Sequence, residues 1–95
     1  MKVMLRSVGL VKQLLGQGEL DLSIPEGTNI SGLLRILAEE KSEKMAPFAV
    51  EPKEPSAHVP LRVMVNGRDI MALEGRFTVL EEGDDVLVFM PIAGG

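Results

Sequence analysis

One amphipathic helix constrains the fold of this 95-residue chain more than any other feature. Its apolar residues recur at intervals of three and four and therefore form a single stripe, which packs one face of the helix on another layer. The stripe consists of Ile30, Leu33, Leu34 and Leu37. Thr28 is expected to cap the first free amides. Cations at residues 41–44 mark the end, because positive charge is favourable near a helix C-terminus.

Short strand patterns lie on both sides of this helix. Before it, Lys2–Val8 and Glu19–Ile24 alternate apolar and polar residues, as half-buried strands do. After it, Leu61–Val65 runs into Asn66-Gly67, the dipeptide that a type I′ hairpin turn prefers. A final strand is predicted at Asp85–Met90. A sheet assembled from these strands would cover the apolar stripe of the helix.

The order of these elements predicts one domain over residues 1–95. The order is strand, strand, helix, strand, short strand and final strand, with hairpins at the edges, so the first and last strands pair in the middle. The expected fold is α+β, a roll of the β-grasp kind with a mixed sheet of four to five strands packed on one main helix. Gly9–Gly18 is interpreted as an irregular connection. Residues 45–60 hold four of the six prolines and are interpreted as a proline-rich loop.

Composition excludes several functional classes. The formal charge is −4 and no run of lysine or arginine is present, so nucleic acid is not an expected partner. No apolar stretch is long enough to cross a bilayer, and residues 1–20 do not resemble a signal peptide, so we expect a cytoplasmic protein without a membrane partner. The absence of cysteine and the single histidine, His58, argue against metal sites and catalytic thiols. We expect no catalytic residues, no metal and no bound cofactor.

The C-terminal residues are the predicted site of action. The final strand leads into Pro91-Ile92-Ala93-Gly94-Gly95. Glycine lacks a Cβ atom, so Gly94 and Gly95 would fit a channel too narrow for side chains. Extended, residues 92–95 reach ~13 Å from the sheet. We expect residues 91–95 to form a flexible tail that inserts its carboxylate into another protein's active site. The alternative is an inert terminus, where small residues also collect.

Strand phase predicts a second surface for partners. If the valines of the strands face the helix, alternate apolar residues gather on the opposite face of the sheet. Flexible methionine would let this patch fit more than one protein. The residues predicted on this face are Met4, Met64, Leu87 and Phe89. Met90 and the tail residues Pro91, Ile92 and Ala93 are also predicted to bind partners. The alternative is that some of these residues are core under loops.

Three stretches together resemble the ubiquitin-like sulfur carriers of the MoaD and ThiS family. They are residues 65–68 (VNGR), residues 80–86 (LEEGDDV) and the final Gly94-Gly95. The resemblance implies that a MoeB/ThiF-like adenylating enzyme uses ATP and Mg²⁺ to couple AMP to the Gly95 carboxylate. Sulfur then replaces AMP and leaves a thiocarboxylate. A carboxylate needs such a leaving group before any nucleophile attacks it. The chain would be a carrier, not an enzyme.

The acceptor of the sulfur is a separate question. Length and the proline-rich insertion most resemble a MoaD-type small subunit, which implies molybdenum or tungsten cofactor synthesis with a MoaE-like large subunit of molybdopterin synthase. Carriers for thiamine, cysteine or tRNA thiolation, and ubiquitin-like protein modifiers, share the same motifs. Ala93 differs from the arginine of ubiquitin and disfavours a ubiquitin-type activating enzyme. A β-grasp interaction module with an inert diglycine remains a further alternative.

Overall fold

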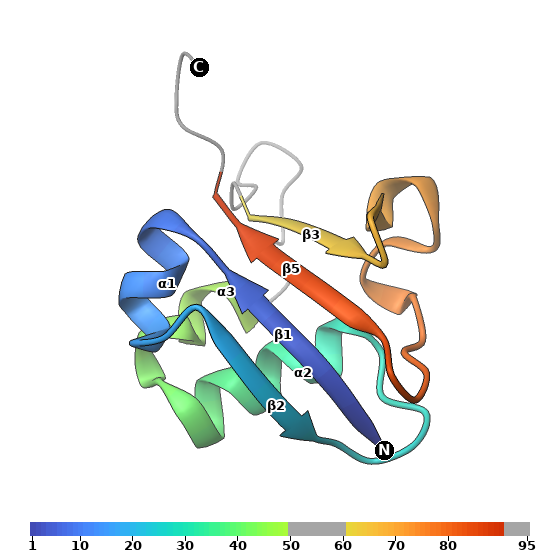
Figure 1. Ribbon diagram of the computed structural model, residues 1–95, viewed down its shortest axis with the longest axis horizontal. Helices are drawn as coiled ribbons and strands as arrows, with labels where there is room; N and C mark the ends of the chain where they lie inside the picture. The colour runs from blue at the N-terminus through green and yellow to red at the C-terminus, as the bar shows by residue number, and fades with distance from the viewer. Residues whose placement is uncertain (50–60, 91–95) are drawn as a thin grey trace.

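A five-stranded sheet forms the centre of the structure, a computed structural model that describes residues 1–49 and 61–90. The strand order is β2-β1-β5-β3-β4 (Figure 1). The strands are β1 Lys2–Ser7, β2 Glu19–Ser23, β3 Arg62–Val65, β4 Arg68–Asp69 and β5 Asp85–Phe89. The first and last strands, β1 and β5, pair in parallel at the centre, and the other pairs are antiparallel. The predicted β-grasp fold is confirmed.

The main helix covers one face of this sheet (Figure 1). Helix α2, Ile30–Ile36, continues into a π-helical segment, Leu37–Lys41. All four residues of the predicted stripe are at most 1% exposed. The cap is one residue later than predicted, because Asn29 Oδ1 accepts from the Gly32 amide at 2.8 Å. The Thr28 hydroxyl instead donates to the Pro25 carbonyl.

The connection between β1 and β2 is a helix and not an irregular segment. Helix α1 spans Gly9–Leu15, and its buried residues are Val11 and Leu15. Gly16 ends the helix with a φ of 84°, and its amide donates to the Lys12 carbonyl at 2.8 Å. A helix of two turns is marginal in isolation, so burial of its apolar face against the domain supplies the stability that its length does not.

The first part of the predicted proline-rich loop is also helical. A 3₁₀ turn, Glu43–Met45, leads into α3, Ala46–Ala49. Met45 and Phe48 are 0% and 9% exposed and belong to the core, so the prediction of a loop was wrong for these residues. The first turn of a helix has free amides in any case, so a proline there removes no helical hydrogen bond. The rest of the loop, residues 50–60 with His58, lies outside the described residues.

The core lies between the sheet and the helices. Strand residues at alternate positions face it, as the period of two predicts. Two 3₁₀ turns, Ile70–Ala72 and Gly75–Phe77, connect β4 to the turn before β5. The buried apolar strand residues are Val3, Leu5, Leu22, Val63, Val65, Val86 and Val88. Within the described ranges, no helix has both the length and the apolar character to cross a membrane.

Candidate functional site

The candidate site is the C-terminal end of β5 and the sheet surface around it. Strand β5 lies between β1 and β3 and is hydrogen-bonded on both sides, so the core fixes its position. Met90, a predicted partner-binding residue and the last described one, is partly buried against the core. The predicted reactive residues Gly94 and Gly95, and the tail residues 91–93, lie outside the described residues. Their roles therefore stay predictions.

The start of β5 is clamped to the β3–β4 hairpin. Asn66 and Gly67 have φ values of 52° and 83°, which confirms the predicted turn with positive φ. The Asn66 side chain donates to Asp84 Oδ1 at 2.9 Å and accepts from the Asp85 amide at 2.9 Å. The other Asp84 oxygen accepts from the Glu81 amide at 2.8 Å. The two sequence motifs at residues 65–68 and 80–86 thus form one hydrogen-bonded unit that fixes the register of β5.

An apolar surface covers the open face of the sheet near the end of β5. Leu87 is paired across the strands with Met64, and Phe89 lies two residues further along the same face. All three are partly exposed. We call Met64, Leu87 and Phe89 the tail-proximal patch. The sequence prediction that these side chains share the face opposite the helices is confirmed.

Met4 shares this face but is separated from the patch. Met4 is paired with Asp85, and Arg6 is paired with Leu87. An ion pair joins Arg6 Nε to Asp85 at 3.0 Å, and the same guanidinium reaches Glu19 at 3.3 Å. A charged strip therefore lies between Met4 and Leu87, so the four residues do not form one apolar patch. Strand phase predicts the face of each residue, but it does not predict which neighbours interrupt a patch.

A shallow hollow of about 520 Å³ lies at the boundary of the patch and the charged strip. It is open to solvent, with apolar side chains on one side and an ion pair on the other. Its lining residues are Arg6, Met64, Asn66, Gly67, Asp85 and Leu87. Such a hollow suits an amphipathic side chain of a partner protein. No sequence pattern predicts this hollow, because its residues come from three strands and a turn.

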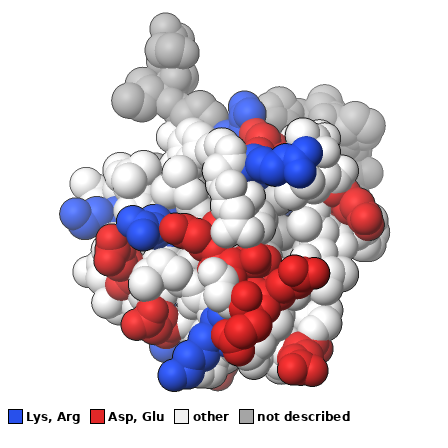
Figure 2. Space-filling view, turned by 45° about the vertical axis from the view of Figure 1, so that its right-hand side comes forward, with Lys and Arg blue, Asp and Glu red and all other residues white. Residues whose placement is uncertain are grey.

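Charge is distributed unevenly over the molecule. Figure 2 shows acidic side chains gathered over the lower part of the face it presents. At the β4 edge of the sheet, the Asp69 carboxylate accepts a hydrogen bond from the Met71 amide and pairs with Arg62. These contacts hold the pKa of Asp69 below its usual value. In the described parts of the chain, no group of three histidine or acidic residues is placed to hold a metal ion.

Comparisons with known proteins agree with this geometry. The model of the ThiS family matches residues 8–95. Small archaeal modifier protein 3 of Haloferax volcanii is 33% identical over the whole of both chains. The solution structure of the HVO 2177 protein, also from Haloferax volcanii, is 30% identical with a TM-score of 0.77, covering 100% of this chain and 87% of that one. A putative molybdopterin converting factor subunit 1 from Pyrococcus furiosus is 24% identical with a TM-score of 0.70, covering 97% and 99%, and shows the fold alone.

Proposed function

The chain belongs to the ThiS family of ubiquitin-like carriers and modifiers, and on this premise we propose that it carries sulfur as a thiocarboxylate on Gly95. The observation that carries the proposal is the family match, which extends through residue 95 and so includes the diglycine. The position of β5 supports the proposal, because a strand held between two neighbours gives the residues after it a fixed starting point on the protein. The chain acts as the substrate of other enzymes and supplies no catalytic group.

The chemistry requires an activating partner. The Gly95 carboxylate attacks the α-phosphate of ATP in a MoeB/ThiF-like enzyme, pyrophosphate leaves, and an acyl adenylate forms. Hydrosulfide then attacks the acyl carbon, the bond to AMP breaks, and the thiocarboxylate forms as AMP departs. Magnesium and ATP are bound by the partner and not by this chain. Gly94 gives the reacting carbonyl clearance, because it has no side chain to contact the walls of a narrow channel.

The tail-proximal patch is the proposed docking surface for this enzyme and later for the acceptor. Its three apolar side chains are partly exposed and contiguous, and they belong to β5 and its neighbour β3. A partner that covers them would hold the end of β5 over its own active site. The hollow beside Arg6 and Asp85 offers a place for one anchoring side chain. Met4 lies beyond the charged strip and is not included in this surface.

For the acceptor, we propose a MoaE-like large subunit of molybdopterin synthase, in molybdenum or tungsten cofactor synthesis. The chain length and the proline-rich segment, which resemble those of a MoaD-type small subunit, support this choice. Protein modification is the second candidate, favoured by the relationship to small archaeal modifier protein 3. Sulfur transfer to thiamine, cysteine or tRNA differs only in the enzyme that receives the sulfur.

Reconstitution tests the proposal in two stages. ATP–pyrophosphate exchange with a cognate adenylating enzyme is expected with the full chain and not with a chain lacking Gly95. The activated protein is then offered either a MoaE-like subunit with its pterin precursor or a lysine-containing protein. Dithiolene formation supports the first acceptor, and an isopeptide bond supports the second. No exchange with the cognate enzyme would refute the carrier proposal itself.

A further inference from the structure

Among residues 1–49 and 61–90, β2 pairs with β1 only, so its outer edge is a free edge of the sheet within this part of the chain. In an antiparallel pair, residues alternate between bonding the partner strand and pointing their backbone groups away from it. Met1 and Ile24 exchange both backbone bonds at 2.8 Å, which fixes this alternation. Counting back along β2, the outward amides and carbonyls belong to Glu19, Asp21 and Ser23. These groups can pair with one more strand.

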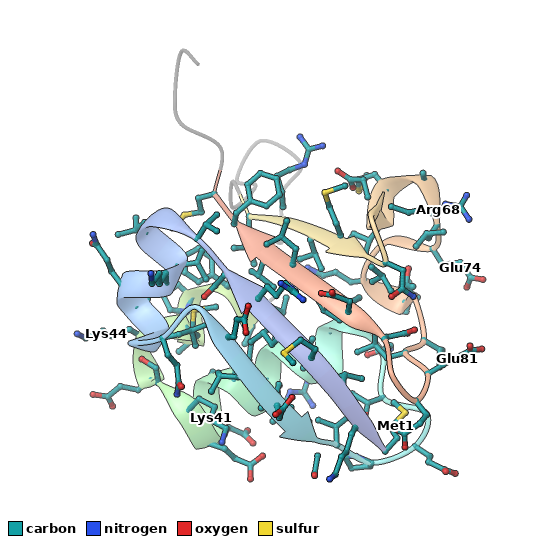
Figure 3. All side chains as sticks on the ribbon, in the orientation of Figure 1. Met1, Lys41, Lys44, Arg68, Glu74 and Glu81 are labelled. Carbon is teal, nitrogen blue, oxygen red and sulfur yellow. The ribbon has the colours of Figure 1, made fainter. Side chains whose placement is uncertain are left out.

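A hollow of about 280 Å³ lies beneath this edge, between β2 and the end of the main helix. The helix is wider here, because the Ser42 amide donates to the carbonyl of Leu37, five residues back, at 2.9 Å. Figure 3 shows Lys41 beside β2, on the helix that passes behind the sheet. The hollow is lined by Asp21, Leu22, Ser23, Ile36, Glu40 and Lys41. Every second side chain of an added strand would point toward it.

The charge of the edge selects among possible strands. Asp21 and Glu40 form no ion pair with any residue in ranges 1–49 and 61–90, whereas Glu19 is already paired with Arg6. A second copy of β2 added antiparallel about its centre would place Asp21 opposite Asp21. Like charges directly opposite destabilise a strand pair, so the acidic edge opposes self-association. A strand with basic side chains on the open face would be attracted instead.

We propose that the β2 edge binds an extended segment of a partner protein in which lysine or arginine alternates with aliphatic residues. The basic side chains lie on the open face beside Asp21, and the aliphatic ones enter the hollow beside Leu22 and Ile36. Backbone hydrogen bonds to the outward groups of β2 give the added strand its register. Strand β1 separates this edge from β5, so the bound segment leaves the tail-proximal patch uncovered. The protein therefore holds one partner at β2 while an enzyme acts on its other side.

A peptide probe tests this inference independently of any chemistry at Gly95. The probe is an acetylated, amidated peptide of alternating lysine and valine, and its control replaces every lysine by glutamate. With isotopically labelled protein, the lysine peptide is expected to shift the amide resonances of Glu19, Asp21 and Ser23 and to slow their hydrogen exchange. The glutamate peptide is expected to do neither. Shifts confined to the tail-proximal patch, or no shifts at all, would overturn the proposal.

Three variants separate strand addition from general charge attraction. Asp21→Lys is expected to weaken binding of the lysine peptide on the order of tenfold or more, because like charges then meet. The matched control Glu81→Lys makes the same charge change in the exposed turn before β5 and is expected to leave binding unchanged. Asp21→Pro removes an outward amide without removing a bond to β1, so it should abolish binding in a folded protein. Equal weakening by Asp21→Lys and Glu81→Lys would refute strand addition.

Discussion

Replacing Asn66 by alanine tests whether the clamp between the hairpin and β5 fixes the fold. The substitution removes two side-chain hydrogen bonds, one to the Asp84 carboxylate and one from the Asp85 amide. Both are solvent-exposed, so together they contribute about 1.5 kcal/mol. Alanine at a φ of 52° costs about 1 kcal/mol more, because it lacks the short polar side chain with which asparagine tolerates the left-handed region. We expect the free energy of unfolding to fall by about 2.5 kcal/mol.

Urea denaturation of the single and double variants separates the two contributions. Asn66→Ala and Asp84→Ala, alone and combined, form a double-mutant cycle. The backbone strain is present with or without Asp84 and cancels, so the coupling energy reports the side-chain bond alone. We expect a coupling of about 1 kcal/mol, the size of one partly solvated hydrogen bond to a charged group. A coupling within about 0.3 kcal/mol of zero would refute the clamp.

Three further predictions concern the core, the β4 edge and the docking surface. Leu37→Ala in the fully buried stripe is expected to lower the free energy of unfolding, measured by urea denaturation, by about 3 kcal/mol. Leu10 is 53% exposed, so Leu10→Ala should lower it by less than about 0.5 kcal/mol. The pKa of Asp69 is lowered in the folded state, so its contribution to stability is present above its ordinary pKa of 3.8 and is lost as pH falls through the folded value. Asp69→Asn should flatten that part of the stability–pH curve, and an unchanged curve would contradict the assignment. Phe89→Asp should abolish binding to the adenylating enzyme in titration calorimetry, whereas Val79→Asp, at an exposed apolar residue outside the patch, should not.

The sequence predicts those elements whose signal is local. The alternation at Glu19–Ser23 and the stripe from Ile30 to Leu37 each follow one period over consecutive residues, and the structure confirms both. The sequence predicts Thr28 as the N-cap of the main helix. In the structure the Thr28 carbonyl accepts a hydrogen bond from the Leu80 amide at 2.9 Å, as in a pair of strands, and the next residue, Asn29, caps the helix. Because that contact joins residues far apart in the chain, the spacing of residues in the sequence does not predict it.

The short helix α3 and the boundary of the tail-proximal patch were not predicted, because they also depend on contacts between distant residues. Met45 and Phe48 lie beside Pro47, and proline favoured a loop, yet burial of both side chains stabilises a helical turn. The ion pair of Arg6 with Asp85 divides the open face of the sheet, and it depends on the register between β1 and β5. Register follows from packing and hydrogen bonding across the whole sheet. The sequence therefore predicts the faces of strands better than the shape of a site built across them.

The intact mass of the protein isolated from its native cells tests the central claim most directly. The account predicts a fraction whose mass exceeds that of the unmodified chain by the replacement of one oxygen with sulfur, located by fragmentation to the Gly95 carboxyl. A chain that lacks Gly95, expressed in the same cells, should carry no such modification. A single unmodified mass, unchanged when the cognate adenylating enzyme is overproduced with a sulfur source, would contradict the account.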